Sequence, residues 1–312
     1  MISPVVTGAD AHYFAMACLL IQSLARWLPG VPVLVCDFGL NPAQRRFLEA
    51  RGALLPRPPS VPEGTHPYRA KAALVDYLSP DPAGADEPVV WFDCDMMAVA
   101  PLAEPLARLL EAMGKHGSTL AACPDAEVAD TAGFIARWGA DVAPFAEAVR
   151  AGGIDPRRPY LNSGFFIASR DALAEVRDRC AALDDHRMID QNGFNLTAWA
   201  PGRRSAVLNA AAWNVHGRLL AEATCDTSGA DEAGEVRCGP HRALVLHATS
   251  VGGVHHEERQ GVLRGEAGDL PITVKFFRSA PLAAIQQNFL AEFTKQHRAA
   301  LIAAGCYQPA WE

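Results

Sequence analysis

Two aspartates spaced by one residue follow a strongly apolar segment, and they are the residues of this chain best suited to chemistry. The apolar segment covers residues 89–92, and Asp93, Cys94 and Asp95 follow it. Alternate residues of a strand point to the same face, so we expect the two carboxylates side by side. Neighbouring carboxylates repel each other unless a cation or a proton lies between them. The pattern fits a site for Mg²⁺ or Mn²⁺, and it also fits an ordinary strand end, where Asp favours a turn.

Other polar residues occupy positions where they can assist such a site. His247 ends a late apolar segment, and a histidine beside a carboxylate pair is a candidate metal ligand, although an isolated histidine is more often structural. Arg69 and Lys71 lie in the first turn of an expected helix, where the helix dipole disfavours cations. The two cations are therefore either solvated or directed at an anionic ligand.

The elements that would position these residues alternate between strand and helix patterns. We expect strands over 2–7, 31–35, 53–55 and 89–92, and helices over 13–28, 41–51 and 68–78. Strand, helix and strand at this spacing predict βαβ units and a parallel sheet with right-handed crossovers. Ligands of such sheets bind at the carboxyl ends of the strands, which is where Asp93 and Asp95 lie.

The second half of the chain continues with a less regular pattern. We expect strands at 120–123, 165–168, 207–208, 213–214 and 243–247, and helices over 101–113, 171–183, 186–198 and 281–304. Asp171 is expected to cap its helix, and residues 160–164 are expected to form a polar turn before a strand. We divide the chain into an α/β domain over 1–270 and a C-terminal helical extension over 271–312 that packs on it.

Composition narrows the class of protein. Half of the 312 residues are apolar, 20% are charged and the net charge is −7, which argues against a general nucleic-acid-binding protein. No apolar run reaches the length of a transmembrane helix. The eight cysteines are scattered without a Cys-x-x-Cys pair, which argues against a zinc ribbon and a disulfide framework. A cytoplasmic location is the simplest expectation.

The order of these features resembles the GT-A-fold glycosyltransferases, and most closely the glycogenin-like and lipopolysaccharide galactosyltransferase-like group, glycosyltransferase family 8. The resemblance covers about Val5 to His247. It rests on the βαβ start, Asp93-Cys94-Asp95, the Asn162-Ser163-Gly164 turn, Asp190-Gln191 on a helix, and His247. It implies an α/β fold with a Rossmann-like, mostly parallel central sheet flanked by helices, and a C-terminal helix.

The resemblance also implies a nucleotide-binding end of the site. The segment from Thr7 to Asp10 matches the uridine-binding turn, with Asp10 near the base and Tyr13 stacking on it. Arg69 matches a helix arginine that approaches the donor. The implied donor is a nucleotide diphosphate sugar, and specifically a UDP-sugar.

Three residues match the metal ligands of the family, namely Asp93, Asp95 and His247. The implied ion is Mn²⁺ or Mg²⁺, and Asp95 is also placed near the ribose and the diphosphate. A metal ion there stabilises the negative charge of the leaving diphosphate as a Lewis acid.

Four further residues match the sugar-binding end. Asn162 and Gly164 correspond to the turn that lines the donor sugar. Asp190 corresponds to a contact to the sugar hydroxyls, and Gln191 to the position on its reactive face. An uncharged glutamine is a poor nucleophile, and the family retains the anomeric configuration by front-face attack, so positioning and charge stabilisation are expected to carry the reaction.

The chain departs from the family after the histidine. The family pattern there is His-x-Gly-x-x-Lys-Pro, with a lysine that holds the diphosphate, whereas residues 248–256 contain neither Lys nor Pro. The candidates to replace this lysine are the backbone N–H groups of Gly252-Gly253 and the side chains of His255, His256 and Arg259.

The sequence thus predicts an enzyme, a metal-dependent hexosyltransferase that moves a sugar from a nucleotide diphosphate donor to an acceptor, with retention. The acceptor is a carbohydrate, a lipid-linked molecule or a protein, and loops 125–159 and 219–242 are the candidates to bind it. One alternative is a nucleotidyltransferase, which would normally have a Gly-rich basic loop after the first strand. Another is a non-catalytic binding protein on a degenerate glycosyltransferase fold.

Overall fold

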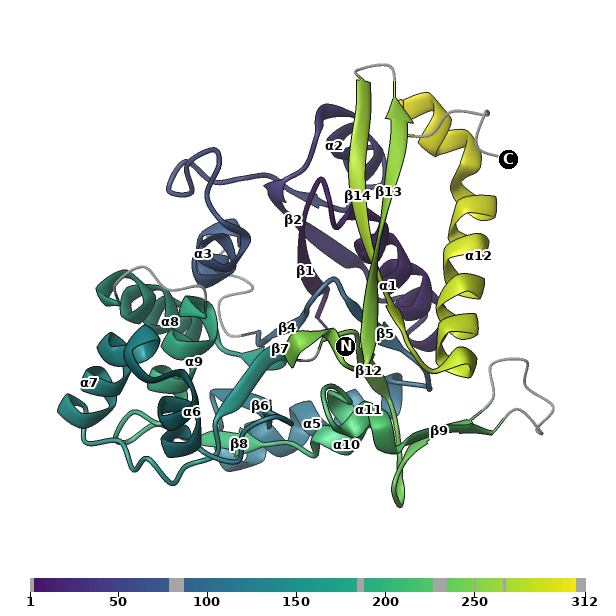
Figure 1. The fold of residues 1–312 in the computed structure, drawn as a ribbon. Helices are drawn as coiled ribbons and strands as arrows, with labels where there is room; N and C mark the ends of the chain where they lie inside the picture. Colours follow the sequence, from purple (N-terminus) through teal and green to yellow (C-terminus); the bar gives the residue numbers. More distant parts are fainter. Residues whose placement is uncertain are drawn as a thin grey trace.

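The computed structural model describes residues 3–78, 87–183, 188–226, 235–249, 251–265 and 268–306. The start of the helix expected at His186 lies outside these residues. A central sheet organises the described part of the chain, with helices on both of its faces (Figure 1).

The central sheet has seven strands in the order β3-β2-β1-β4-β7-β6-β8. Their bounds are β1 Val5–Asp10, β2 Val33–Gly39, β3 Leu54–Leu55, β4 Val89–Phe92, β6 Leu120–Pro124, β7 Leu161–Ala168 and β8 Ser205–Val207. Strand β7 is antiparallel to both of its neighbours, β4 and β6, and the other strands run parallel to one another. The expectation of a mostly parallel sheet is therefore confirmed, and β7 is its one antiparallel strand among the described residues.

Helices follow most of the strands, and the helix expected over 68–78 is divided at Ala73 into two short helices. The described helices are α1 Phe14–Trp27, α2 Pro42–Glu49, α3 Pro67–Ala72, α4 Leu74–Tyr77, α5 Ala103–His116, α6 Thr131–Trp138, α7 Ala143–Ala151, α8 Arg170–Ala182, α9 Ile189–Ala198, α10 Ala210–Trp213, α11 Leu219–Glu222 and α12 Ala280–Ala304. Asn41 caps α2 in a capping box with Gln44, and Pro42 takes the first helical position. The local sequence therefore sets the start of this helix.

Several other local expectations differ from the structure. Strand β1 continues to Asp10, where a turn was expected, and Asn162 lies inside β7. Trp213 ends the short helix α10, because Asn209 caps it and the indole stacks on Phe165 at 5.1 Å between ring centroids. Ser169, not Asp171, caps α8.

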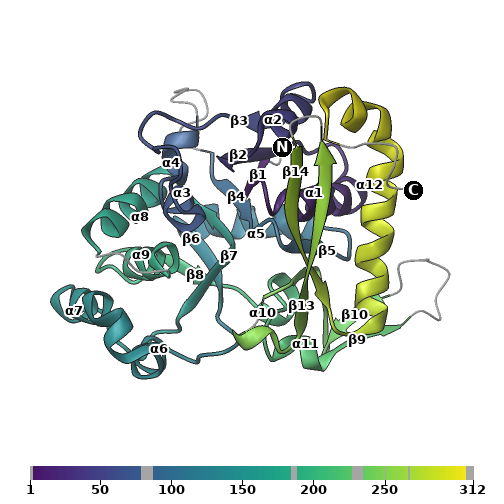
Figure 2. The same cartoon turned by 45° about the horizontal axis from the view of Figure 1, so that its top comes forward.

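A long hairpin and a long helix complete the molecule after the site-forming strands. Strands β13 (His256–Gly265) and β14 (Gly268–Phe277) pair antiparallel, and β14 packs against α1 and α12 (Figures 1 and 2). The sequence analysis predicted the helix and missed the hairpin, and residue 270, the expected domain boundary, falls inside β14. The division into two domains stays a prediction.

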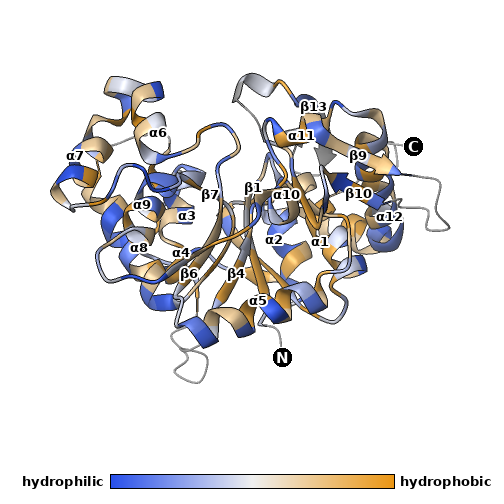
Figure 3. Ribbon diagram, turned by 90° about the horizontal axis from the view of Figure 1, so that it is seen from below, coloured by the Kyte–Doolittle hydropathy of each residue, from blue (hydrophilic) through white to orange (hydrophobic). Residues whose placement is uncertain are grey.

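Smaller strands connect the late part of the chain to the sheet. Strand β12 (Val245–His247) pairs antiparallel with β5 (Met96–Ala98), while β9 (Ala223–Asp226), β10 (Glu235–Cys238) and β11 (His241–Arg242) form a separate sheet. Short 3₁₀ helices cover Gly139–Val142 and Val251–Gly253. Apolar residues concentrate in the central strands, as Figure 3 shows from below. Within the described ranges, no helix combines the length and apolar character that crossing a bilayer requires.

Candidate active site

A cleft of about 810 Å³ opens at the carboxyl ends of β1 and β4, and most of the predicted site residues line it. The predicted residues that line it are Asp10, Tyr13, Asp93, Asp95, Asn162, Asp190, Gln191 and His247. Thr7, Arg69 and Gly164 are not among the described residues that line it. The location at this edge of the sheet agrees with where parallel α/β sheets bind ligands.

The two aspartates lie in a turn between β4 and β5, not within a strand as the alternation argument assumed. The Met96 N–H donates to the Asp93 carbonyl at 3.0 Å and closes the turn. The pairing of β12 with β5 places His247 opposite Met96, next to Asp95. The Ala248 N–H donates to the Asp95 carbonyl at 2.9 Å and ties the two segments together. Backbone pairing therefore brings the three predicted ligands together.

The three side chains offer one ligand atom each to a common point. Nε2 of His247 lies 3.1 Å from Oδ1 of Asp95 and 4.0 Å from Oδ2 of Asp93, and ligand atoms of the three residues all lie within 4.8 Å of one another. Octahedral ligands at about 2.0–2.1 Å from Mg²⁺ are separated by about 3 Å when adjacent and about 4 Å when opposite. The spacing therefore fits a divalent cation, and the mixture of two carboxylates with one imidazole suits Mn²⁺.

A line of hydrogen bonds fixes the imidazole from behind. Nδ1 of His247 lies 3.0 Å from Oδ1 of Asn214, the Asn214 amide nitrogen donates to Oδ1 of Asn162 at 2.8 Å, and the Asn162 amide nitrogen donates to Asp125 at 3.1 Å. We call Asp125, Asn162, Asn214 and His247 the amide relay.

The Asp125 carboxylate, at the far end of the amide relay, determines which group donates in each hydrogen bond of the relay. Burial raises the pKa of Asp125, but contacts from His216, the Glu127 N–H and Asn162 outweigh burial and lower the pKa to about 2. An ionised carboxylate only accepts hydrogen bonds, so each amide turns its nitrogen toward Asp125 and its oxygen toward His247. Nδ1 of His247 then carries the proton, and Nε2 presents its lone pair to the cation site.

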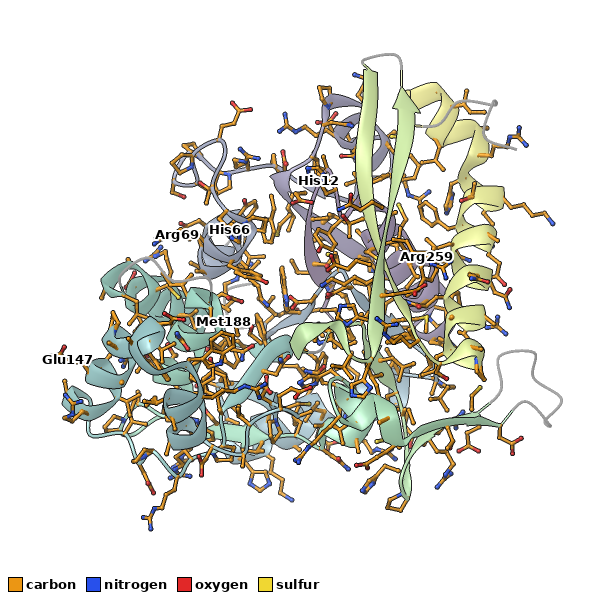
Figure 4. The ribbon with its side chains drawn as sticks, viewed as in Figure 1. His12, His66, Arg69, Glu147, Met188 and Arg259 are labelled. Atoms are coloured by element: carbon orange, nitrogen blue, oxygen red, sulfur yellow. The ribbon has the colours of Figure 1, made fainter. Side chains whose placement is uncertain are left out.

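Two lysines neutralise the acidic cluster, and both come from segments far from Asp93 and Asp95 in the sequence. Nζ of Lys71 lies 2.7 Å from Asp93, 3.3 Å from Asp190 and 3.1 Å from the Ser163 hydroxyl. Lys71 of α3 is buried and reaches the acidic cluster, whereas Arg69 of the same helix is not among the described residues that line the cleft. Figure 4 shows Arg69 and His66 on the α3 side of the molecule.

Lys275 on β14 occupies the opposite side of the cluster. Its Nζ lies 2.8 Å from Oδ2 of Asp95 and 5.2 Å from the centre of the Tyr13 ring. The suggested replacements for the family lysine do not line the cleft in the described residues, with the exception of Gly252. His256 is buried on β13, and Arg259 pairs with Glu257 at 2.5 Å on the hairpin (Figure 4). Among the described residues, the cation beside Asp95 is Lys275, which comes from β14 and not from residues 252–259.

The two cations act differently on the two aspartates. Burial raises the pKa of Asp93, and Lys71 only partly opposes that rise because Asp95 adds a like charge. Burial also acts to raise the pKa of Asp95, but Lys275 and His247 outweigh it and the pKa is lowered. Asp95 is therefore held as a carboxylate by its neighbours, as a metal ligand must be.

Asp190 and Gln191 begin α9 and form another wall of the cleft. The Asp190 carboxylate accepts from the Ser163 hydroxyl at 3.0 Å, and Oε1 of Gln191 accepts from the Ser163 N–H at 3.3 Å. Gln191 is 6% exposed, and its Nε2 lies beside the buried Tyr160 hydroxyl without forming a hydrogen bond of standard geometry within the described residues. A buried donor that lacks a well-aligned acceptor is costly, so this amide is a candidate to donate to a ligand once its side chain turns into the cleft.

The remaining predicted residues support the site from its edges. A Cβ at Gly164 would lie 2.5 Å from Cε1 of His247, so glycine is needed there for the imidazole to pack on β7. Oδ1 of Asp10 accepts from the N–H groups of His12 and Tyr13 and shapes the turn before α1. Burial raises the pKa of Tyr13 to about 12. Thr7 is fully buried in β1.

The sequence carries a weak signal for Lys275 and none for the other two unpredicted residues, Asn214 and Asp125. Lys275 belongs to a segment in which Ile272, Val274 and Phe276 alternate with polar residues, a pattern typical of a strand. Asn214 and Asp125 carry no local signature, because their part in the site depends on the pairing of distant strands.

Comparison with known proteins agrees with this architecture. No family model and no curated protein match the chain. Among solved structures, the galactosyltransferase LgtC in complex with donor and acceptor sugar analogs is similar, with 16% identity and a TM-score of 0.53 over 95% of this chain and 99% of LgtC. The apo bifunctional glycosyltransferase WbbM has 18% identity and a TM-score of 0.49 over 69% of this chain, which spans 40% of WbbM. Mouse xyloside xylosyltransferase 1 has 12% identity and a TM-score of 0.44, covering 79% and 97% of the two chains.

The likeness to LgtC shows a shared fold over almost the whole of both chains. The predicted GT-A fold is confirmed, with its mostly parallel sheet, flanking helices and long C-terminal helix. The acidic group of Asp93, Asp95 and His247 lies at the carboxyl edge of this sheet.

Proposed function

We propose that this chain is a divalent-metal-dependent glycosyltransferase, similar to family 8, that moves a sugar from a UDP-sugar to an acceptor hydroxyl with retention of configuration. The observation that carries the proposal is the convergence of Asp93, Asp95 and His247 in a cleft that Asp190 and the amide of Gln191 also line. A cation site and a sugar-sized polar wall in one cleft are what transfer from a nucleotide sugar requires.

Asp93, Asp95 and His247 would hold Mn²⁺ or Mg²⁺, and the bound ion would supply Lewis-acid stabilisation of the charge on the leaving diphosphate. The amide relay keeps the His247 lone pair directed at this site. Lys71 holds Asp93 and Asp190 in fixed positions between the cation site and the sugar wall. The chain's own contribution at this end is a preorganised set of charges, which costs no rearrangement during the reaction.

The sugar-binding residues position the donor for attack on one face. Asp190 accepts hydrogen bonds from sugar hydroxyls, and Nε2 of Gln191 donates to an oxygen on the reactive face. The bond from the anomeric carbon to the diphosphate breaks as the acceptor oxygen attacks from the same side, and the hydroxyl proton leaves with the diphosphate. A neutral amide at Gln191 favours this front-face course over a covalent glycosyl intermediate, because an amide is a poor nucleophile.

The base would bind at the Tyr13 and Asp10 end of the cleft, and the acceptor at the end formed by α6. Trp138, Phe134 and Glu127 line that second end. Aromatic rings beside a carboxylate suit a carbohydrate, whose apolar ring face stacks and whose hydroxyls donate hydrogen bonds.

Calorimetric titration with UDP tests the proposal. Wild-type protein in Mn²⁺ is expected to bind UDP, and chelation of the metal should weaken that binding by at least about tenfold, because the cation supplies charge to the diphosphate. Asp95→Asn should abolish the Mn²⁺ effect, while Asp171→Asn, an exposed residue of α8, should not. UDP binding that is equal with and without metal would overturn the proposal.

A further inference from the structure

Lys275 covers two groups that the proposed function requires to be open. Its ammonium contacts Oδ2 of Asp95 at 2.8 Å, and Asp95 is a proposed metal ligand. The same ammonium lies 5.2 Å from the centre of the Tyr13 ring, on which the base is proposed to stack. The Lys275 side chain is 14% exposed and lines the cleft.

Hydrogen bonds hold the backbone of Lys275, whereas its ammonium is held only through a flexible stem. The Gln286 amide nitrogen donates to the Lys275 carbonyl at 3.0 Å, and Oε1 of Gln286 accepts from the Phe277 N–H at 2.8 Å. Gln286 is fully buried on α12, so it anchors β14 at this point. The lysine stem has four rotatable bonds, so the ammonium can change partners without movement of the strand.

The two cleft lysines differ in how many partners hold them. Lys71 contacts Asp93, Asp190 and the Ser163 hydroxyl, so its displacement would leave two carboxylates unpaired. Within the part of the chain that the structure describes, the Lys275 ammonium has a single carboxylate partner, Asp95. Lys275 is therefore the cleft lysine that can move at the lower cost.

The charges of the cluster change sign when a divalent cation enters. Asp93, Asp95 and Asp190 supply three negative charges against the two positive charges of Lys71 and Lys275, which leaves the cluster with one net negative charge. A divalent cation makes the net charge positive, so it repels the Lys275 ammonium with which it shares Asp95. A diphosphate entering next supplies new acceptor oxygens beside that ammonium.

We propose that Lys275 is a resident counter-ion that occupies Asp95 in the empty cleft and transfers to the diphosphate of the donor once the metal and the nucleotide bind. This inference rests on the proposed function and adds the residue that couples the two binding events. Lys275 opposes metal binding alone, since it competes for Asp95, and it favours nucleotide binding to the metal-loaded site.

The test measures whether the affinities for Mn²⁺ and for UDP rise or fall in Lys275→Met. Lys275→Gln serves as a second variant with an uncharged side chain. Without nucleotide, the affinity for Mn²⁺, measured by electron paramagnetic resonance of the free ion, should rise by about threefold to tenfold when one competing charge is removed. With saturating Mn²⁺, the affinity for UDP, measured by calorimetry, should fall by about tenfold, the size of one lost charge-assisted hydrogen bond.

Lys295→Met, the same change at an exposed residue of α12, should alter neither affinity, and thermal unfolding checks that each variant is folded. If wild-type UDP binding depends on Mn²⁺ but the two affinities of both Lys275 variants move in the same direction or do not change, the role of Lys275 is overturned. If wild-type protein binds UDP equally with Mn²⁺ and with chelator, the proposed function itself fails.

Discussion

Replacement of Asn214 with leucine should weaken metal binding although Asn214 is not a proposed metal ligand. Asn214 is fully buried and joins His247, at 3.0 Å, to Asn162, at 2.8 Å. Leucine has a similar size and no acceptor, so the proton on Nδ1 of His247 loses its partner. The neutral ring then favours the other tautomer, with its proton on Nε2 toward Oδ1 of Asp95, which lies 3.1 Å away. That proton occupies the lone pair that the metal needs.

The expected loss follows from what such supporting hydrogen bonds contribute elsewhere. Removal of a group that orients a metal-bound histidine typically lowers metal affinity about 10- to 100-fold, or about 1.4–2.7 kcal/mol. The free energy of unfolding should also fall by about 1–3 kcal/mol, because the variant leaves buried polar groups without partners. The effect on metal affinity and the effect on stability are separate, and a matched control distinguishes them.

Asn192→Leu is that control. Asn192 is as buried as Asn214, and its Oδ1 accepts from the Tyr160 hydroxyl at 2.8 Å, with no part in the amide relay. Mn²⁺ titration of both variants gives the affinities, and urea unfolding gives their stabilities. Long-range ¹H–¹⁵N correlation spectra report which nitrogen of His247 carries the proton, with His247→Gln to assign the signal.

The reasoning fails if Asn214→Leu binds Mn²⁺ as tightly as wild-type protein, or if Asn192→Leu loses as much affinity. It fails equally if the wild-type spectrum places the proton of neutral His247 on Nε2. Any of these results would mean that the amide relay does not direct the imidazole.

Two further predictions concern the same part of the site. Gly164→Ala should weaken Mn²⁺ binding by about tenfold or more, because its Cβ would lie 2.5 Å from Cε1 of His247 and displace the ring from a fixed geometry. Asp125→Asn should make the protein less sensitive to acid: the lowered pKa of Asp125, about 2 against an ordinary 3.8, stabilises the fold above pH 4 and is lost as the pH falls toward 2. Urea unfolding at pH 5 and pH 2 measures how much the free energy of unfolding decreases between the two pH values. This decrease should be about 2 kcal/mol larger in wild-type protein than in Asp125→Asn, and equal decreases would contradict this account.

Local sequence pattern was sufficient for the first βαβ unit and for the residues at strand ends. The βαβ pattern predicted β1, α1 and β2, and the apolar segments before Asp93 and His247 predicted the strands that deliver them. These features depend on local periodicity, which a single sequence displays directly. The antiparallel direction of β7 and the turn around Asp93 depend on which strands pair, and local pattern does not encode pairing.

The partners of the two cleft lysines could not be predicted from the sequence, and for both lysines the cause is the same. Lys275 meets Asp95 across 180 residues of chain, and Lys71 meets Ser163 across 92. Nothing near Lys275 indicates a partner, and the hairpin that carries it was not predicted. The resemblance pointed to Arg69, although both Arg69 and Lys71 lie in one turn of α3. Side chains two positions apart on a helix point to different faces, so one of them can line the cleft while the other does not.

The location of a bound metal ion tests the central claim most directly. Crystals grown with Mn²⁺ and UDP, measured near the manganese absorption edge, would locate the ion by its anomalous scattering. We expect one peak in the cleft within about 2.0–2.3 Å of Oδ2 of Asp93, Oδ1 of Asp95 and Nε2 of His247, with diphosphate oxygens completing the coordination. A peak elsewhere, or UDP bound in the cleft with no peak beside these three residues, would contradict the account.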